Sequence, residues 1–258
     1  AKRPEIWLLK PRMDSRTQLT LYVALGVAVS AVSIHSLSQR EPSHDGRGLT
    51  AWLGDFDEGT SEAYQRASDA IDGMGTNTLP RLLSLLQSKD TPLDRAMDRM
   101  ADSQSMVEFD WETAFDRHWQ ALRGFEALGG EAKPAIPELA QRLERGENPE
   151  FVSFALARIG IDSLPVLKAA TTNENAWVRR ASTAALGILG KDAQDAIPAL
   201  VDRLKDANAF VRRNAAETLG RIGDTAREAI PALKDASTDG DGSVSRAAED
   251  ALGKIALR

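Results

Sequence analysis

The sequence has 258 residues, no cysteine, 5% aromatic residues and a formal net charge of −6. Without cysteine the chain can form no disulfide, no thiolate metal site and no cysteine nucleophile. Frequent Ala and Leu beside few aromatic residues favour close-packed helices over sheets, and the length suits one large domain or an elongated array.

An uncharged segment lies near the N-terminus. Residues 17–39 contain no Asp, Glu, Lys or Arg, and residues 19–34 are mostly apolar. A membrane-spanning helix needs about 20 predominantly apolar residues, so we expect residues 17–39 to form a transmembrane anchor. Two alternatives remain: a signal segment cleaved after small residues near Ser33, and a buried core helix.

Residues 1–16 form a basic tail before this segment, with five Lys or Arg against two Asp or Glu. Excess positive charge marks the cytoplasmic side of a span. We therefore expect the tail in the bacterial cytoplasm and the rest of the chain in the periplasm, or secreted if the segment is cleaved. The tail carries +3, which leaves −9 on residues 17–258. An acidic exported domain argues against nucleic acid as a partner.

Residues 40–57 are predicted to form a polar linker and a short entry helix. Pro and Gly residues interrupt the linker. Leu49, Trp52 and Leu53 follow at the spacing of one helix face. We expect this helix to close the first end of a repeat array, because terminal repeats need a cap.

A pattern with a period of 33 residues fills the C-terminal third of the chain. A fixed period between 20 and 50 residues is the mark of a solenoid of stacked units. The recurring sets are Val178, Val211 and Val244; Arg180, Arg213 and Arg246; Leu186, Leu219 and Leu252; Gly187, Gly220 and Gly253; and Leu189, Ile222 and Ile255.

Glycine and proline divide residues 58–258 into units. In each unit a helix is predicted to end at a Gly that needs a left-handed conformation, and the next to carry Pro in its first turn. The Gly and Pro are 5 or 8 residues apart, which indicates two turn variants. The glycines are Gly75, Gly129, Gly160, Gly190 and Gly223, and the prolines are Pro80, Pro137, Pro165, Pro198 and Pro231.

The helices between these breaks are predicted to be amphipathic, with an apolar stripe such as Val211, Ala215 and Leu219. The recurring Gly187, Gly220 and Gly253 fall inside helices, where Gly is unfavourable by about 1 kcal/mol relative to Ala. We therefore expect a neighbouring helix to approach each of them too closely for a side chain.

The copies carry a pattern of a turn, Val-Arg, small residues and Leu-Gly in NAWVRRASTAALGILG and NAFVRRNAAETLGRIG, and a first-helix pattern in AIPALVDRLKD. These features resemble HEAT repeats, specifically the short bacterial HEAT-like class also found in phycobilin lyase subunits. The resemblance covers roughly residue 61 to the C-terminus. It implies an all-α, right-handed superhelix of helix pairs with a concave face for partner proteins, here preceded by one transmembrane helix. It implies no activity, because function lives in sites rather than folds.

Candidate partner-binding residues come from the repeats and from one irregular segment. Arg180, Arg213 and Arg246 would form a ladder that either binds an acidic partner or pairs with Asp206, Asp239 and Asp241 of adjacent units, and we favour the structural role. Residues 91–115 break the register and are either an irregular repeat or an inserted loop. The aromatic residues Trp111 and Trp119, in and beside this segment, are further candidates.

No catalytic, cofactor-binding or metal-binding pattern stands out. His44 is expected to be a solvated linker residue, and His118 lacks a nucleophile beside it. The sequence has no phosphate-binding Gly loop and no zinc spacing. The leading interpretation is a non-enzymatic scaffold for protein partners, with no small-molecule substrate evident. The alternatives are an accessory or chaperone-type subunit related to phycobilin lyases and a HEAT-like DNA glycosylase.

Overall fold

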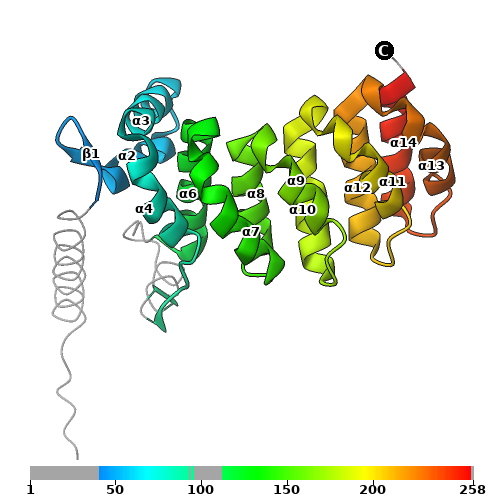
Figure 1. Cartoon of the computed structure of the whole chain (residues 1–258), viewed down its shortest axis with the longest axis horizontal. Coiled ribbons are helices and arrows are strands. Elements are labelled where there is room, and N and C mark those ends of the chain that lie inside the picture. Colours follow the sequence, from blue (N-terminus) through cyan, green and yellow to red (C-terminus); the bar gives the residue numbers. More distant parts are fainter. Residues whose placement is uncertain (1–40, 93, 96–111, 257–258) are drawn as a thin grey trace, which may run out of the picture. The chain divides into compact units, whose positions relative to one another are not determined.

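The computed structural model describes residues 41–92, 94–95 and 112–256. These residues belong almost entirely to one compact unit, Pro42–Arg258. It alternates long and short helices (Figure 1). The long helices are α3 (Ser61–Met74), α6 (Ala114–Leu128), α8 (Pro149–Ile159), α10 (Ala176–Leu189), α12 (Ala209–Ile222) and α14 (Gly242–Ala256). The short helices are α4 (Leu79–Leu85), α7 (Ile136–Glu144), α9 (Leu164–Ala170), α11 (Ile197–Arg203) and α13 (Ile230–Ala236).

The helices form two layers. Each long helix from α3 to α14 packs against the next long helix, and each short helix packs against the long helix that follows it. Among the described residues, the main contacts of each unit are with its neighbours along the array, as in a solenoid. This arrangement confirms the predicted all-α repeat fold, while the handedness of the superhelix stays a prediction.

The turns between the layers follow the predicted Gly and Pro. Every helix-ending Gly has a positive φ, between 47° and 102°. Their ψ values are negative, between −125° and −155°, so they adopt a region open only to Gly rather than the left-handed helical region we expected. A 3-10 segment follows each Gly, and Pro stands in the first turn of each short helix. The short turns are η2 (Gly75–Thr78) and η4 (Ile161–Ser163), and the long turns are η3 (Gly129–Ala135), η5 (Gly190–Ala196) and η6 (Gly223–Ala229).

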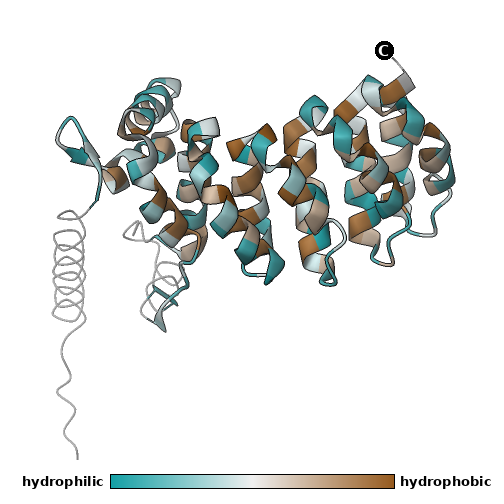
Figure 2. Cartoon of the chain, viewed as in Figure 1, coloured by the Kyte–Doolittle hydropathy of each residue, from teal (hydrophilic) through white to brown (hydrophobic). Residues whose placement is uncertain are grey.

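The core lies between the two layers. The predicted stripe of α12 is buried, with Val211, Ala215 and Leu219 at 0% exposure. Figure 2 shows hydrophobic residues on the helices and mainly hydrophilic residues in the turns that join them. At about 25 cal/mol per Å² of apolar surface, this burial is the main favourable term in folding.

The first end of the array differs from the prediction in one respect. The predicted linker contains an antiparallel hairpin, β1 (Ser43–His44) and β2 (Arg47–Gly48). Asp45 and Gly46, both at positive φ, form its turn, a pairing typical of tight hairpins. The side chain of His44 is 40% exposed and its ring lies edge-on to that of Trp52, while its backbone carbonyl accepts a hydrogen bond of 3.2 Å from the Trp52 indole. The entry helix α2 (Leu49–Asp55), followed by η1 (Phe56–Glu58), buries Trp52 as expected.

Three predicted segments fall outside the described residues: the basic tail at 1–16, the span at 17–39, and most of the irregular segment 91–115, including Trp111. Within the described part of the chain, no helix is long and apolar enough to cross a membrane.

The recurring glycines inside the last three long helices mark close helix contacts, with one exception. A Cβ on Gly187 would lie 2.9 Å from Oγ1 of Thr218, and a Cβ on Gly220 would lie 3.0 Å from Cα of Ala251. A Cβ on Gly253 would meet nothing within 4 Å. The expectation is therefore confirmed for Gly187 and Gly220 and wrong for Gly253, because no further long helix packs beyond α14 in the described chain.

This difference predicts opposite effects of one substitution at two equivalent positions. Gly220→Ala should lower the free energy of unfolding by about 1 to 3 kcal/mol, because the added methyl pushes against the backbone of α14. Gly253→Ala should raise it by up to about 1 kcal/mol through helix propensity alone. Urea denaturation monitored by circular dichroism measures both, and equal effects at the two positions would contradict the packing described.

Candidate partner-binding surface

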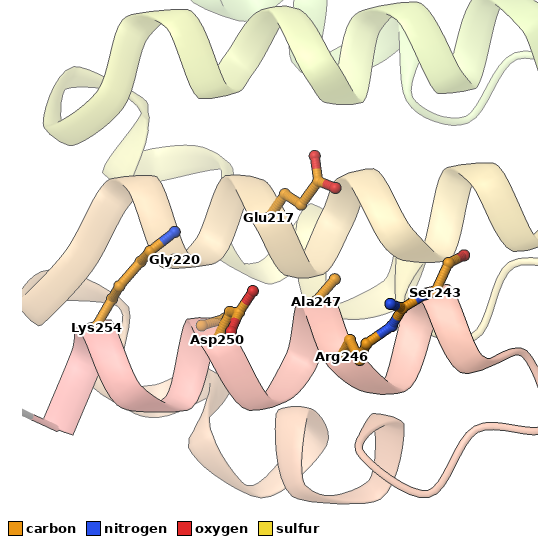
Figure 3. A pocket seen from close by; sticks show the side chains of 8 residues that line it. Glu217, Gly220, Ser243, Arg246, Ala247, Asp250 and Lys254 are labelled. Atoms are coloured by element: carbon orange, nitrogen blue, oxygen red, sulfur yellow. The ribbon is translucent and has the colours of Figure 1, made fainter.

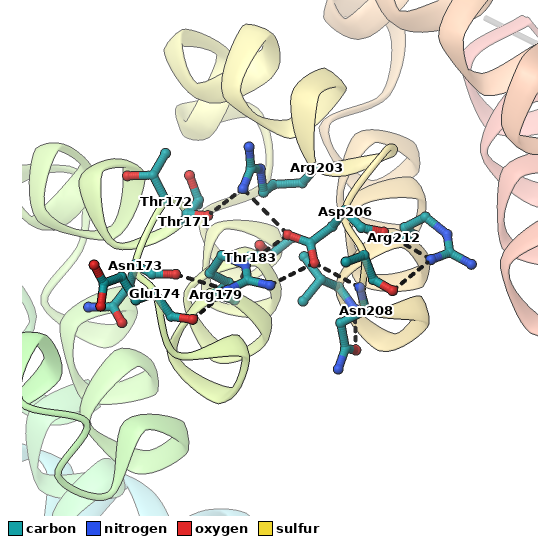
Figure 4. A network of polar contacts seen from close by, with 12 residues as sticks. Thr171, Thr172, Asn173, Glu174, Arg179, Thr183, Arg203, Asp206, Asn208 and Arg212 are labelled. Atoms are coloured by element: carbon teal, nitrogen blue, oxygen red, sulfur yellow. Dashed lines mark hydrogen bonds and ion pairs between the residues drawn. The ribbon is translucent and has the colours of Figure 1, made fainter.

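One arginine in each of two consecutive units binds a carboxylate of the next unit. Figure 4 shows the first of these pairs, Arg179 with Asp206. Arg179 of α10 donates from Nε and Nη2 to the carboxylate of Asp206, with both distances 2.8 Å. Arg212 of α12 binds Asp239 in the same way, at 2.8 and 2.9 Å. Each carboxylate lies in the loop that precedes the next long helix. These two bidentate pairs are the inter-unit staples.

Each staple also fixes the loop of its own unit. Arg179 donates from Nη1 to the carbonyls of Asn173 and Glu174, at 3.0 and 2.9 Å. Arg212 donates in the same manner to the carbonyl of Asp206, at 2.9 Å. One guanidinium thus ties together two loops that carry no regular secondary structure, and its fork geometry suits this task better than an ammonium group.

The staples hold their aspartates in the charged form. Burial acts to raise the pKa of Asp206, but the Arg179 hydrogen bond and the amide of Asn208 outweigh it, so the pKa lies below its usual value. The hydrogen bond from Arg212 lowers the pKa of Asp239. A carboxyl group with a lowered pKa stabilises the fold at neutral pH, and this contribution is lost as the pH falls through that pKa.

His118 occupies the equivalent position of an earlier unit. It stands 11 residues before Gly129, as Arg179 stands before Gly190 and Arg212 before Gly223. Its Nε2 lies 3.1 Å from the carbonyl of Ser88 and 3.3 Å from the side-chain nitrogen of Asn148 in the next unit. Burial lowers its pKa. His118 therefore has a structural place between units.

The structure corrects the predicted pairing of the arginine ladder. Asp206 and Asp239 do bind arginines of the adjacent unit, but their partners are Arg179 and Arg212, one residue earlier than predicted. Successive helix residues point about 100° apart. Arg180, Arg213 and Arg246 consequently point away from these aspartates. Arg180 bonds Glu150 of the preceding unit, whereas Arg213 and Arg246 contact residues of their own helices.

The ladder residues make weaker contacts than the staples. Nη2 of Arg180 donates to Oε2 of Glu150 at 3.0 Å, and Nε of Arg213 lies 3.5 Å from Oε1 of Glu217. Arg246 donates to the carbonyl of Gly242, at 3.0 Å. Solvent-exposed pairs of this kind typically contribute about 0 to 1 kcal/mol.

The arginine ladder occupies one repeated position of the long helices, called the row from here on. In earlier units this position holds Glu150 and Trp119. Trp119, Glu150, Arg180 and Arg213 each stand 10 residues before the Gly that ends their helix. Trp119 is 39% exposed and belongs to an aromatic cluster with Phe115 and Phe151, whose ring centroids lie 5.8 to 6.1 Å apart. Phe115 is 58% exposed. Phe151 packs against the hydrophobic core, whereas Phe115 and Trp119 keep much of their surface exposed.

Two further aromatic residues lie on this face and are not among the predicted candidates. Trp177 and Phe210 are 63% and 55% exposed, at equivalent positions of α10 and α12. The guanidinium carbon of Arg180 lies 4.8 Å from the Trp177 ring centroid, and that of Arg213 lies 5.6 Å from the Phe210 centroid. Their 33-residue separation was the signal available in the sequence. The third copy carries Ser243 instead.

Three hollows open on or beside the row. One of about 260 Å³ lies between α12 and α14 and holds Glu217, Arg246, Asp250 and Lys254 (Figure 3). A second of about 250 Å³ lies beside Trp177, Arg180 and Glu150. The largest, about 570 Å³, is lined by Gly54, Asp57, Glu112, Asp116, Trp119, Gln120 and Arg123. Of these three, only the last has a volume within the range of about 300 to 1,000 Å³ that is typical of small-molecule sites.

The hollows hold no evident catalytic arrangement. No group of three or more His, Cys, Asp or Glu side chains in the described residues is placed to hold a metal ion. In the largest hollow, Asp57 is paired with Arg123 at 2.5 Å and Glu112 accepts a hydrogen bond from Gln120 at 2.9 Å.

A family model of HEAT repeats matches residues 134–205 and 164–253. Residues 134–253 are therefore similar to HEAT repeats. The matched residues include both staples and the arginines Arg180 and Arg213. A comparison with curated proteins finds no match.

Several solved structures are similar to this chain. An engineered protein is 18% identical over 82% of this chain and 100% of its own, with a TM-score of 0.42. A designed armadillo repeat protein in complex with a (KR)4 peptide is 14% identical over 80% and 99%, with a TM-score of 0.41. Human deoxyhypusine hydroxylase in complex with glycerol is 17% identical over 91% and 100%, with a TM-score of 0.42. At these TM-scores the likeness carries no argument about what this chain binds or does.

The contrast between neighbouring arginines makes a direct prediction. Arg212→Ala should lower the free energy of unfolding by about 2 kcal/mol or more, because it removes charge-assisted hydrogen bonds and leaves Asp239 unpaired. Arg213→Ala should change it by less than about 0.5 kcal/mol. Thermal and urea unfolding of the two variants provide the measurement, and a larger loss for Arg213→Ala would reverse the assignment of roles.

Proposed function

We propose that this chain is a non-enzymatic scaffold that binds partner proteins through its HEAT array. The observation that carries the proposal is the row of arginines and exposed aromatic residues on the solvent face of the long helices. Trp177 and Phe210 expose more than half of their surface. Folding gains little from such exposed rings, whereas aromatic and arginine side chains are the residues most enriched at protein interfaces.

The separation of roles within the array supports the same function. The staples use Arg179 and Arg212 to hold the units together, which leaves Arg180 and Arg213 at the surface. A solenoid built in this way presents a long, fixed surface without needing a cleft. Protein partners fit such a surface better than a small substrate, because small-molecule sites are enclosed hollows.

We further propose that residues 17–39 tether the array to the bacterial inner membrane. The uncharged segment and the basic tail of residues 1–16 favour a single span with the tail in the cytoplasm. The array would then lie in the periplasm, where its partners are the exposed parts of other membrane or periplasmic proteins. If the segment is cleaved, the array is secreted instead.

Cell fractionation with protease protection, followed by crosslinking, tests this proposal. The chain should sediment with inner membranes, and protease added to spheroplasts should degrade the array, because it faces the periplasm. Crosslinking before solubilisation should then yield a specific adduct. A variant lacking residues 17–39, expressed in the cytoplasm, serves as the control.

Two results would contradict the proposal. Recovery of the natural chain in the soluble cytoplasmic fraction would remove the tether and the location. Absence of any adduct from a chain that is correctly located would remove the scaffold role.

A further inference from the structure

The row of arginines and exposed rings has a chemistry specific enough to suggest its ligand. We propose that α10, α12 and α14 bind an extended segment of a partner protein in which acidic residues alternate with aromatic or large aliphatic ones. This inference rests on the scaffold function proposed above and names the partner class of the same surface.

The apolar part of the ligand follows from two repeated rings. Trp177 and Phe210 stand at the second position of their helices, so they lie at the same end of adjacent long helices. Adjacent long helices pack directly against each other. Two rings exposed by 63% and 55% therefore form a repeated apolar contact along the array. A ligand that uses both must itself repeat its apolar residues.

The acidic part follows from the stacked guanidinium groups. Arg180 and Arg213 each stand three residues after the ring on which they stack, at 4.8 and 5.6 Å from its centroid. Stacking holds the planar group in place and leaves donors at its edge for a carboxylate. A preorganised side chain loses less conformational entropy when a ligand binds.

The charge of this region agrees with an acidic ligand. Helix α10 contains two Arg and no acidic residue, and α12 contains three Arg and one Glu, in a chain of net charge −6. The present partners of Arg180 and Arg213 are Glu150 and Glu217, which are 53% and 46% exposed. A ligand carboxylate can replace such solvated partners at small cost. Arg246 has no carboxylate within ion-pair distance in the described chain and extends the row.

A nearby hollow can receive one side chain of the ligand. The space beside Trp177, between the start of α8 and the start of α10, has a volume of about 250 Å³. This volume lies below the range of about 300 to 1,000 Å³ that holds whole small molecules. Asn148 and Asn175 line it together with Arg180 and Glu150, so polar groups are available to a ligand backbone.

A protein segment fits these observations better than a nucleic acid. Both could use arginine and aromatic contacts. However, the carboxylates of Glu150 and Glu217 lie beside the arginines and are 53% and 46% exposed, so a continuous polyanion would have to pass them. A peptide can place its acidic residues beside the arginines and neutral residues elsewhere.

Selection from a displayed library of random peptides tests the inference. The full chain in detergent micelles serves as the bait, and peptides of about 12 residues are long enough to reach across three helices when extended. Selected peptides should be enriched in Asp or Glu alternating with aromatic or aliphatic residues. The consensus peptide, labelled with fluorescein, then gives affinities by fluorescence anisotropy.

Variants locate the binding surface. Arg213→Glu, and separately Trp177→Ser combined with Phe210→Ser, should each weaken binding by about tenfold or more. Two exposed residues of the 3-10 turns provide matched controls: Arg227→Glu for the charge and Ile161→Ser for the apolar contact. Both controls should bind within about twofold of the parent, and circular dichroism should show all variants folded.

Three outcomes would overturn the inference: enrichment of basic peptides or of none, equal binding of the acidic peptide to Arg213→Glu, and equal binding of a single-stranded oligonucleotide. If these variants still capture the partner that crosslinks to the parent chain, the scaffold function stands and only the assignment of this surface is wrong.

Discussion

The fold depends on fixing each unit to the next, and the paired guanidinium and carboxylate of the staples do this at two successive junctions. Arg212 bonds two loops at once, with Nε and Nη2 on Asp239 and Nη1 on the carbonyl of Asp206. Units of a solenoid have no contacts except those with their neighbours. The geometry of each junction therefore determines whether equivalent surface residues of successive units stay aligned.

The staples leave the adjacent position free, because neighbouring helix residues point in different directions. Arg180 and Arg213 lie on the solvent face, where their contacts to Glu150 and Glu217 are exposed and weak. The same Arg-Arg pair thus serves two purposes: the first residue, 14% or 19% exposed, bonds the next unit, and the second, 25% or 33% exposed, makes the weaker contacts. This division gives the proposed binding surface a rigid base, since the stapled residue holds the helix that carries the exposed one.

Much of this fold could be predicted from the 33-residue period and from the Gly and Pro residues that end and begin helices, because these features act locally. The period defines a spacing but not which side of the helix each residue faces. That is why the staple was assigned to Arg213 rather than Arg212. It also could not reveal that Gly253 lacks the helix that packs on Gly220. Trp177 and Phe210 were overlooked because the third copy has Ser243, so the position did not appear to recur.

A double-mutant cycle between Arg212 and Asp239 tests the central claim most directly. It measures the coupling free energy of the pair from the unfolding of the parent, Arg212→Ala, Asp239→Ala and the double variant. The staple predicts a coupling above about 1 kcal/mol, since the pair is bidentate and the two side chains are only 19% and 15% exposed. A coupling below about 0.3 kcal/mol would show that the units hold together without the staple and would contradict the division of roles between Arg212 and Arg213.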